Sequence, residues 1–166
     1  SPPGGVNVVR VESAAEMYEA VMQRLGEMDA VVKAAAVADY RPARMMDTKM
    51  KKNAESLTLE LVRNPDILQA IGEWKAARAG QRTPFTIGFA AETDNVEAYA
   101  MDKLRRKKCD LIAANDVTRP GAGFGSDTNV VSVYAPDGLV EHIPLAAKRQ
   151  VAERIWQLAA ERMDRQ

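Results

Sequence analysis

The stretch "AVVKAAAVADYRP", residues 30–42, carries the strongest indication of how this 166-residue chain folds. It begins as a continuous run of small and apolar residues, which is typical of a strand buried on both faces of a parallel sheet. We therefore predict a strand over residues 29–38. The run ends in Asp39, Tyr40 and Arg41, so a carboxylate, a phenol and a guanidinium follow directly on an apolar strand.

The rest of the chain alternates between short apolar runs and longer segments with helical periodicity. Ser13 and Glu16 have the spacing of a helix-capping box, and Asn64 before Pro65 is typical of a helix start. Alternating strands and helices predict an α/β fold with a Rossmann-like, doubly wound, mostly parallel sheet, extended by a β-hairpin around residues 136–138. We expect further strands at residues 6–11, 57–62, 85–92 and 110–116, and helices at residues 13–26, 65–78, 95–108 and 145–165.

The composition argues against several functional classes. Basic and acidic residues both number 23, so the net charge is zero, whereas proteins that bind nucleic acid or membrane surfaces usually carry excess positive charge. No apolar run approaches the roughly 20 residues that cross a bilayer, and no signal peptide is visible. With one cysteine, Cys109, and one histidine, His142, neither an internal disulfide nor a zinc site is expected. We expect a cytoplasmic protein without nucleic-acid or membrane partners, in which any anion site is local.

Polar side chains end three of the predicted strands. In open α/β sheets, ligands bind beyond the carboxyl ends of the strands. Asp39 precedes a long loop rather than a helix, and we interpret it as a candidate ligand contact. Asp94 and Asn95 open a helix, so we interpret them as capping residues in preference to ligand contacts. Asn115, near the end of residues 110–116, has small neighbours that would let a ligand approach the backbone.

Two lysines lie on the predicted inner face of the helix at residues 95–108. At about 100° per residue, Lys103 and Lys107 project into the same sector as the apolar stripe. That stripe contains Val96, Tyr99, Ala100 and Leu104. Either the lysine stems cover apolar surface while their ammonium groups reach water, or an anion such as a phosphate chain binds between them. The sequence alone leaves both explanations open.

A basic run, "KMKK", occupies residues 49–52 in the polar connection after the first buried strand. As a bare motif it is weak, because most charge runs are solvated surfaces. Its position in a long loop that leaves a strand tip nevertheless favours a role in covering a substrate, since such loops often do so.

Taken together, these residues resemble the phosphopantothenoylcysteine synthetase domain of the bacterial bifunctional coenzyme A biosynthesis proteins, which combine a phosphopantothenoylcysteine decarboxylase and a phosphopantothenate–cysteine ligase. The resemblance rests on motifs that occur in the family's order and spacing over residues 34–129. They are "AAAVADYRP", "KMKK", "LVRNPDIL", "GFAAETDN", "KLRRKKCDLIAAND" and "GFGSDTN". Each motif alone is weak, but the ordered set is specific to the family.

The resemblance implies that residues 1–166 form a CTP-dependent ligase domain of coenzyme A biosynthesis. In this family the carboxylate of 4′-phosphopantothenate attacks the α-phosphorus of CTP, which gives an acyl-cytidylate and pyrophosphate. The amine of L-cysteine then displaces CMP and forms the amide. The resemblance also implies Mg²⁺ with the triphosphate, although it assigns no metal ligand here, and a homodimer. FMN is implied only for a decarboxylase that is fused upstream in many of these multifunctional proteins.

The family's CTP contacts map onto this chain by position. The resemblance implies contacts at Asp39, Lys49, Asn64, Pro65, Asp66, Ile67, Phe89, Lys103 and Lys107, with weaker contacts to CTP or the acyl-cytidylate at Ala35 and Ala36. We infer that Lys49, Lys103 and Lys107 neutralise the triphosphate and the charge that develops at the α-phosphorus, with Lys49 and Lys103 as the catalytic pair. Asp39 is inferred to accept from the cytosine amino group or a ribose hydroxyl.

The chain begins at "SPPGG", after the position where the family has a GPT-type motif and an asparagine that acts on the acyl-cytidylate. We therefore expect an N-terminally truncated domain. The alternative expectation is a catalytically incomplete CTP-binding and dimerisation module, with residues 57–62 as a candidate for pairing across subunits. A nicotinamide-binding Rossmann domain is disfavoured, because no Gly-x-Gly-x-x-Gly follows a strand and opens a helix.

Overall fold

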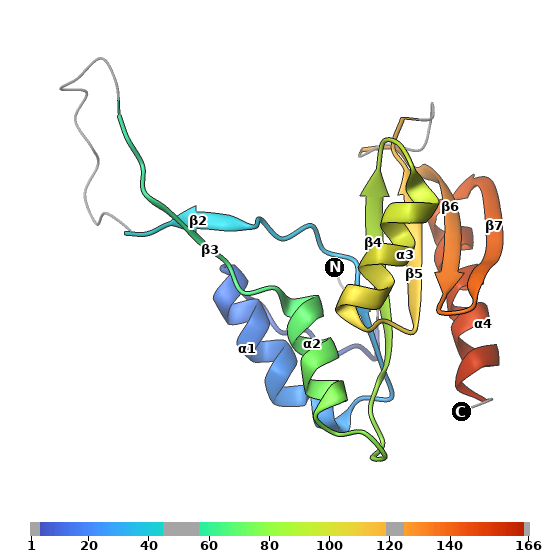
Figure 1. Cartoon of the computed structure of the whole chain (residues 1–166), viewed down its shortest axis with the longest axis horizontal. Helices are drawn as coiled ribbons and strands as arrows, with labels where there is room; N and C mark the ends of the chain where they lie inside the picture. Colours follow the sequence, from blue (N-terminus) through green and yellow to red (C-terminus); the bar gives the residue numbers. More distant parts are fainter. Residues whose placement is uncertain (1–3, 45–56, 119–124, 165–166) are drawn as a thin grey trace.

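The computed structural model describes residues 4–44, 57–118 and 125–164, and Figure 1 shows how their elements are arranged. The strands in these ranges are β1 (Ala30–Lys33), β2 (Tyr40–Pro42), β3 (Leu61–Arg63), β4 (Phe85–Glu92), β5 (Leu111–Asp116), β6 (Thr128–Ala135) and β7 (Gly138–Ala147). The helices are α1 (Ala14–Arg24), the 3₁₀ turn η1 (Leu25–Glu27), α2 (Ile67–Ala76), α3 (Val96–Lys107) and α4 (Lys148–Met163).

The main sheet has five strands in the order β1-β4-β5-β6-β7. β1, β4 and β5 run parallel to one another, whereas β6 and β7 form an antiparallel hairpin on the β5 side. Gly138 closes this hairpin with a φ of 116°, a backbone conformation that glycine adopts readily. The predicted α/β fold with parallel strands and a hairpin extension is therefore confirmed.

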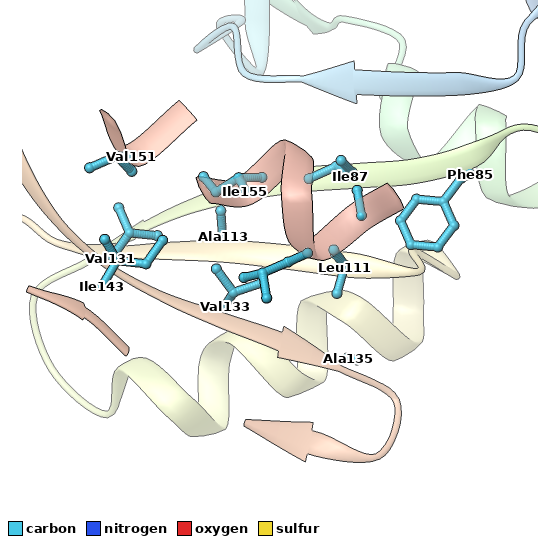
Figure 2. Packing of buried hydrophobic residues seen from close by; sticks show 12 residues of the cluster. Phe85, Ile87, Leu111, Ala113, Val131, Val133, Ala135, Ile143, Val151 and Ile155 are labelled. Atoms are coloured by element: carbon cyan, nitrogen blue, oxygen red, sulfur yellow. The ribbon is translucent and has the colours of Figure 1, made fainter. Parts of the chain in front are cut away.

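Helices cover both faces of the main sheet. On one face, α4 packs Val151, Ile155 and Leu158 against apolar strand residues such as Ile87 and Leu111. Figure 2 shows Val151 and Ile155 of α4 beside these strand residues. On the other face, α3 packs against alternate residues of the same strands. The side chains buried there include Leu68, Ala90, Ala100, Leu104, Ile112, Ala114 and Tyr134. Strands whose residues are buried on both faces account for the continuous apolar runs in the sequence.

The edge strands differ from the sequence predictions. The predicted strand at residues 29–38 is only β1, because β4 pairs with Ala30–Lys33 and the chain then leaves the sheet as a loop. The predicted strand at residues 6–11 is wrong: Val6, Val8 and Val9 are about half exposed, and this segment pairs with no strand in the described part of the chain. An alternating apolar pattern becomes a strand only where a neighbour accepts its backbone hydrogen bonds.

Two helix starts also differ from the predictions. α2 begins after Asp66, whose Oδ1 accepts from the Gln69 N–H at 2.9 Å, so Asp66 and not Asn64 is the N-cap. α4 begins at Lys148, because residues 145–147 extend the pairing of β7 with β6. The cap of α1 is confirmed, since Ser13 Oγ accepts from the Glu16 N–H at 3.2 Å.

β2 and β3 form a separate antiparallel pair that extends away from the main sheet (Figure 1). The predicted strand at residues 57–62 is shorter and shifted, since pairing is limited to Leu61–Arg63. The basic run at residues 49–52, including Lys49, lies outside the described residues. Among the described helices, none is long and apolar enough to cross a membrane.

Candidate functional site

A cavity of about 480 Å³ lies beyond the carboxyl ends of the parallel strands β1, β4 and β5. The loop after β1, the start of α2, the end of β4 and one face of α3 form most of its wall. This is the position at which open α/β sheets bind their ligands. The cavity therefore lies where the polar strand tips predicted a site.

The predicted contact residues gather at this cavity, although they are far apart in the sequence. The lining residues that the sequence analysis identified are Ala35, Ala36, Asp39, Asn64, Pro65, Asp66, Ile67, Phe89, Lys103 and Lys107. Lys49 is outside the described residues, so the structure does not place it. One cavity thus brings together the strand tip, the helix start and the lysine pair that the sequence singled out separately.

Several lining residues were missed as predicted contacts. Lys33, Lys148, Asn129 and Gly125 also face the cavity, and so does Asn115, which the sequence marked only as a polar strand tip. Lys33 could have been identified from the sequence, because it is a charged residue within an otherwise small and apolar run. Lys148 gave no such signal, because its place at the cavity depends on where β7 ends and α4 begins.

Asn64 holds the loop that carries Asp39. Its Nδ2 donates to the Ala38 carbonyl at 2.8 Å, and its backbone N–H donates to the Asp39 carbonyl at 2.8 Å. Its Oδ1 in turn accepts from Arg41 Nη1 at 3.1 Å. These bonds replace the helix-capping role expected for Asn64, so this residue positions the loop after β1 relative to the start of α2.

Lys107 joins α3 to the start of α2. Its Nζ donates to Asp66 Oδ2 at 2.6 Å and to Gln69 Oε1 at 3.0 Å. The Lys107 side chain is only 10% exposed, against 50% for Asp66. Burial acts to raise the pKa of Asp66, but the hydrogen bonds from Lys107 and the Gln69 N–H together hold that pKa below its ordinary value.

The predicted inner face of α3 is confirmed only in part. Ala100 and Leu104 are buried as predicted, but Tyr99 is 47% exposed. Lys107 neither reaches into water nor lacks an anion, because Asp66 is its carboxylate partner. Lys103 is half-buried at the cavity, and no hydrogen bond or ion pair of its ammonium group is found in the described part of the chain.

The cavity is positively charged in a protein of zero net charge. Its described lining contains four lysines and two aspartates, and 4 − 2 leaves a formal charge of +2. The lysines come from β1, α3 and α4, so separate elements direct cations at the same space. Such an arrangement favours an anionic ligand over a neutral one.

Cys109 is buried in the apolar cluster between α3 and the main sheet, and a Cβ on Gly88 would lie 3.4 Å from its Sγ. Burial raises the pKa of Cys109 to about 12 from an ordinary 9.0. We predict that a maleimide-type reagent at pH 8 modifies this thiol about a thousandfold more slowly in the native chain than in the urea-unfolded chain, since the thiolate is the reactive form. Similar rates in the two states would show that the thiol is accessible.

The fold and the cavity define an open α/β protein with a positively charged ligand site at the carboxyl ends of its parallel strands. The chain belongs to the family described as the DNA/pantothenate metabolism flavoprotein C-terminal domain, which matches residues 1–163. This membership confirms the family resemblance drawn from the ordered motifs.

The chain is also similar to coenzyme A biosynthesis bifunctional proteins CoaBC. It is 44% identical over 155 residues to that of Vibrio vulnificus strain YJ016, covering 92% of this chain and 37% of the relative. It is 45% identical over 156 residues to that of Bacillus subtilis strain 168, covering 94% and 37%. For Escherichia coli strain K12 the identity is 39% over 165 residues, covering 98% and 39%. The chain thus spans less than two-fifths of the length of these relatives.

Two solved structures have a similar fold. The crystal structure of the C-terminal domain of a CoaBC protein superposes with a TM-score of 0.78 and 41% identity, covering 100% of this chain and 72% of that one. The DNA/pantothenate metabolism flavoprotein from Streptococcus pneumoniae gives a TM-score of 0.76 at 19% identity, covering 97% and 75%. At that identity the second comparison supports the fold alone.

Proposed function

We propose that this chain forms the CTP-binding part of a phosphopantothenate–cysteine ligase in coenzyme A biosynthesis. The observation that carries the proposal is the gathering, in one positively charged cavity, of the described residues that the family resemblance marked as CTP contacts. Family membership over residues 1–163 supports the same assignment. In this proposal 4′-phosphopantothenate, CTP and L-cysteine are the substrates.

The cavity offers groups suited to each part of CTP. Lys103 and Lys107 supply positive charge for the triphosphate, and Lys49 is proposed to join them from the connection after β2. The start of α2 lies in the cavity wall through Pro65 and Ile67, and the amides of a helix N-terminus favour anions. Phe89 is proposed to lie against the base, with Asp39 accepting from the cytosine amino group or a ribose hydroxyl.

The reaction proposed for this site has two transfers. The carboxylate of 4′-phosphopantothenate attacks the α-phosphorus of CTP and pyrophosphate leaves, so an acyl-cytidylate forms. The amine of L-cysteine then attacks the acyl carbon, CMP leaves, and a proton is lost from the nitrogen. Lys49 and Lys103 are proposed to stabilise the negative charge that builds up on the phosphate oxygens during the first transfer.

Mg²⁺ is proposed to accompany the triphosphate, where it would offset phosphate charge. In the described residues no three His, Cys, Asp or Glu side chains gather as a ready metal site. Mg²⁺ often binds through substrate phosphates and waters with only one or two protein carboxylates. We therefore propose that Mg²⁺ arrives with the nucleotide.

We further propose a cytoplasmic homodimer, in which the projecting β2–β3 pair is the candidate contact between subunits. Leu61 in β3 and Leu59 just before it are more than half exposed, which supports this choice. The bifunctional relatives suggest a fused or separate decarboxylase partner, and FMN would belong to that partner. A catalytically incomplete module that binds CTP and dimerises is the second candidate.

Calorimetry with CTP, ATP and UTP tests the nucleotide assignment. We expect CTP to bind more tightly than the other two, and Lys103→Ala to weaken CTP binding by about ten- to a hundredfold, because a charge-assisted hydrogen bond contributes about 1.5–3 kcal/mol. Arg105→Ala is the matched control, since Arg105 is exposed on the same helix and lies outside the cavity lining. Equal affinity for all three nucleotides, with no effect of Lys103→Ala, would remove the assignment.

A CMP-release assay then separates the two candidate functions. The full chain is incubated with 4′-phosphopantothenate, L-cysteine and CTP, and the release of CMP is followed with time. Release that depends on both other substrates supports the complete ligase. CTP binding without CMP release supports the incomplete module.

A further inference from the structure

Lys33 occupies a position at the cavity that neither the motifs nor the comparisons assign. Lys33 is the last residue of β1 and pairs with Gly88 of β4. The residue after Gly88 is Phe89, which lines the cavity. Its side chain lines this cavity and also a smaller apolar groove formed by residues of α1, β1 and α2. A half-buried lysine in this position can cover apolar surface with its stem while its ammonium group faces the cavity.

The ammonium group of Lys33 folds back onto its own loop. Nζ donates to the carbonyl oxygen of Ala35 at 2.7 Å, and Ala35 is itself a cavity residue. This is the single hydrogen bond found for that group in the ranges that the structure describes, whereas an ammonium carries three donors. A carbonyl has no net charge, so this hydrogen bond does not pair Lys33 with an anion.

The charges around Lys33 favour a negatively charged ligand. Burial and the positive charge of Lys103 lower the pKa of Lys33, while Asp66 and Asp39 act in the opposite direction. Asp66 is already hydrogen bonded to Lys107. Two ammonium groups that repel each other in a partly buried cavity are unfavourable unless an anion lies near both of them.

We propose that Lys33 is a binding residue for the phosphate chain of the ligand and acts together with Lys103. The identity of the ligand as CTP, and with it the polyphosphate chain, rests on the proposed function, whereas the lining charges favour an anion of any class. When the ligand binds, a negatively charged phosphate oxygen accepts a hydrogen bond from Nζ, and this contact is also an ion pair, which the Ala35 carbonyl cannot provide.

The competing explanation is structural, with Lys33 doing no more than tying down the loop after β1. That loop also carries Asp39, which is proposed to contact the nucleoside. A structural tie would therefore affect nucleoside and polyphosphate binding together. A phosphate contact affects polyphosphate alone, and this difference separates the two explanations.

The experiment is calorimetry of the full chain with two probes, inorganic tripolyphosphate and cytidine. Lys33→Met is expected to weaken tripolyphosphate binding about tenfold and to leave cytidine binding unchanged, because it removes the charge but keeps the stem. Lys33→Arg keeps the charge and is expected to stay within about threefold of the original affinity. Lys108→Met, at an exposed lysine just after α3, is the control and is expected to change neither affinity.

Lys33→Gln is measured in parallel, and thermal unfolding verifies that each variant is folded. Equal losses for tripolyphosphate and cytidine would overturn the proposal in favour of the loop tie. Unchanged tripolyphosphate affinity in Lys33→Met and Lys33→Gln would also overturn it, as would a wild-type chain that does not bind tripolyphosphate. A wild-type chain without preference for CTP, but with a specific tripolyphosphate loss in Lys33→Met, would reject the proposed function and keep the proposal for Lys33.

Discussion

Gly72→Ala is expected to lower the free energy of unfolding by about 3 kcal/mol, which is the upper part of the range for overpacked cores. A Cβ at Gly72 would lie 2.2 Å from the carbonyl oxygen of Lys107 and 2.9 Å from its carbonyl carbon. Both are backbone atoms at the end of α3, so they cannot rotate away. Alanine favours a helix over glycine by about 1 kcal/mol, but this gain is smaller than the clash. Urea unfolding followed by circular dichroism measures the change.

Two other glycines are matched controls for the same substitution. A Cβ at Gly26 would meet nothing closer than Trp74 Cζ2 at 3.8 Å, so Gly26→Ala is expected to be nearly neutral. At Gly88 the nearest atoms are Ile112 Cδ1 at 2.6 Å and Leu68 Cδ2 at 2.9 Å, which are the ends of flexible side chains. Gly88→Ala should therefore fall between the other two. A Gly72→Ala variant as stable as Gly26→Ala would contradict the close approach of α2 to α3.

The sequence predicted the central strands better than the edge strands. The predicted strand at residues 85–92 has the same bounds as β4, because a strand buried on both faces reads as a nearly continuous apolar run. β1 and the segment at residues 6–11 have similar apolar character, yet one is a short strand and the other is no strand. Whether such a segment forms a strand depends on where a neighbouring strand offers backbone hydrogen bonds. The apolar pattern of the segment itself does not reveal where that neighbour lies.

The cavity was predictable to the extent that its residues lie at strand ends. Parallel strands bring their carboxyl ends to one edge of a sheet, so Asp39 and Asn115 were expected to lie near one another, and both line the cavity. The pairing of Lys107 with Asp66 was not predictable in the same way. It depends on how closely α2 approaches α3, and that distance is set by the absence of a side chain at Gly72. Tertiary packing therefore decided the partner that helical periodicity left open.

Asp66→Asn tests this pairing while keeping a side chain that can cap α2, since asparagine is about as good an N-cap as aspartate. We expect it to destabilise the chain by about 2 kcal/mol at pH 7, because it leaves Lys107 nearly buried without a carboxylate. Breaking a fully buried ion pair costs about 3–5 kcal/mol, and the half-exposed Asp66 lowers that figure. Lys107→Met removes the cation instead, and its cost is expected to be about 1 kcal/mol, because the aspartate left behind is half solvated.

The two substitutions together are expected to cost little more than Lys107→Met alone, since the second change removes a charge that no longer has a partner. A double-mutant cycle measures this coupling. Additive costs would show that the two side chains do not stabilise each other.

The same variants give an expected dependence on pH. The pKa of Asp66 in the folded chain lies below its ordinary value of 3.8, so the unfolded chain takes up the proton first as pH falls. The stability that its charge contributes is therefore present above about pH 4 and is lost as pH falls through the lower, folded pKa. Urea unfolding at pH 7, 5, 4 and 3 should show the difference between the wild type and Asp66→Asn narrowing below pH 4. A difference that stays constant over this range would mean that Asp66 stabilises the chain without its charge, and the ion pair would then contribute nothing to the junction of α2 and α3.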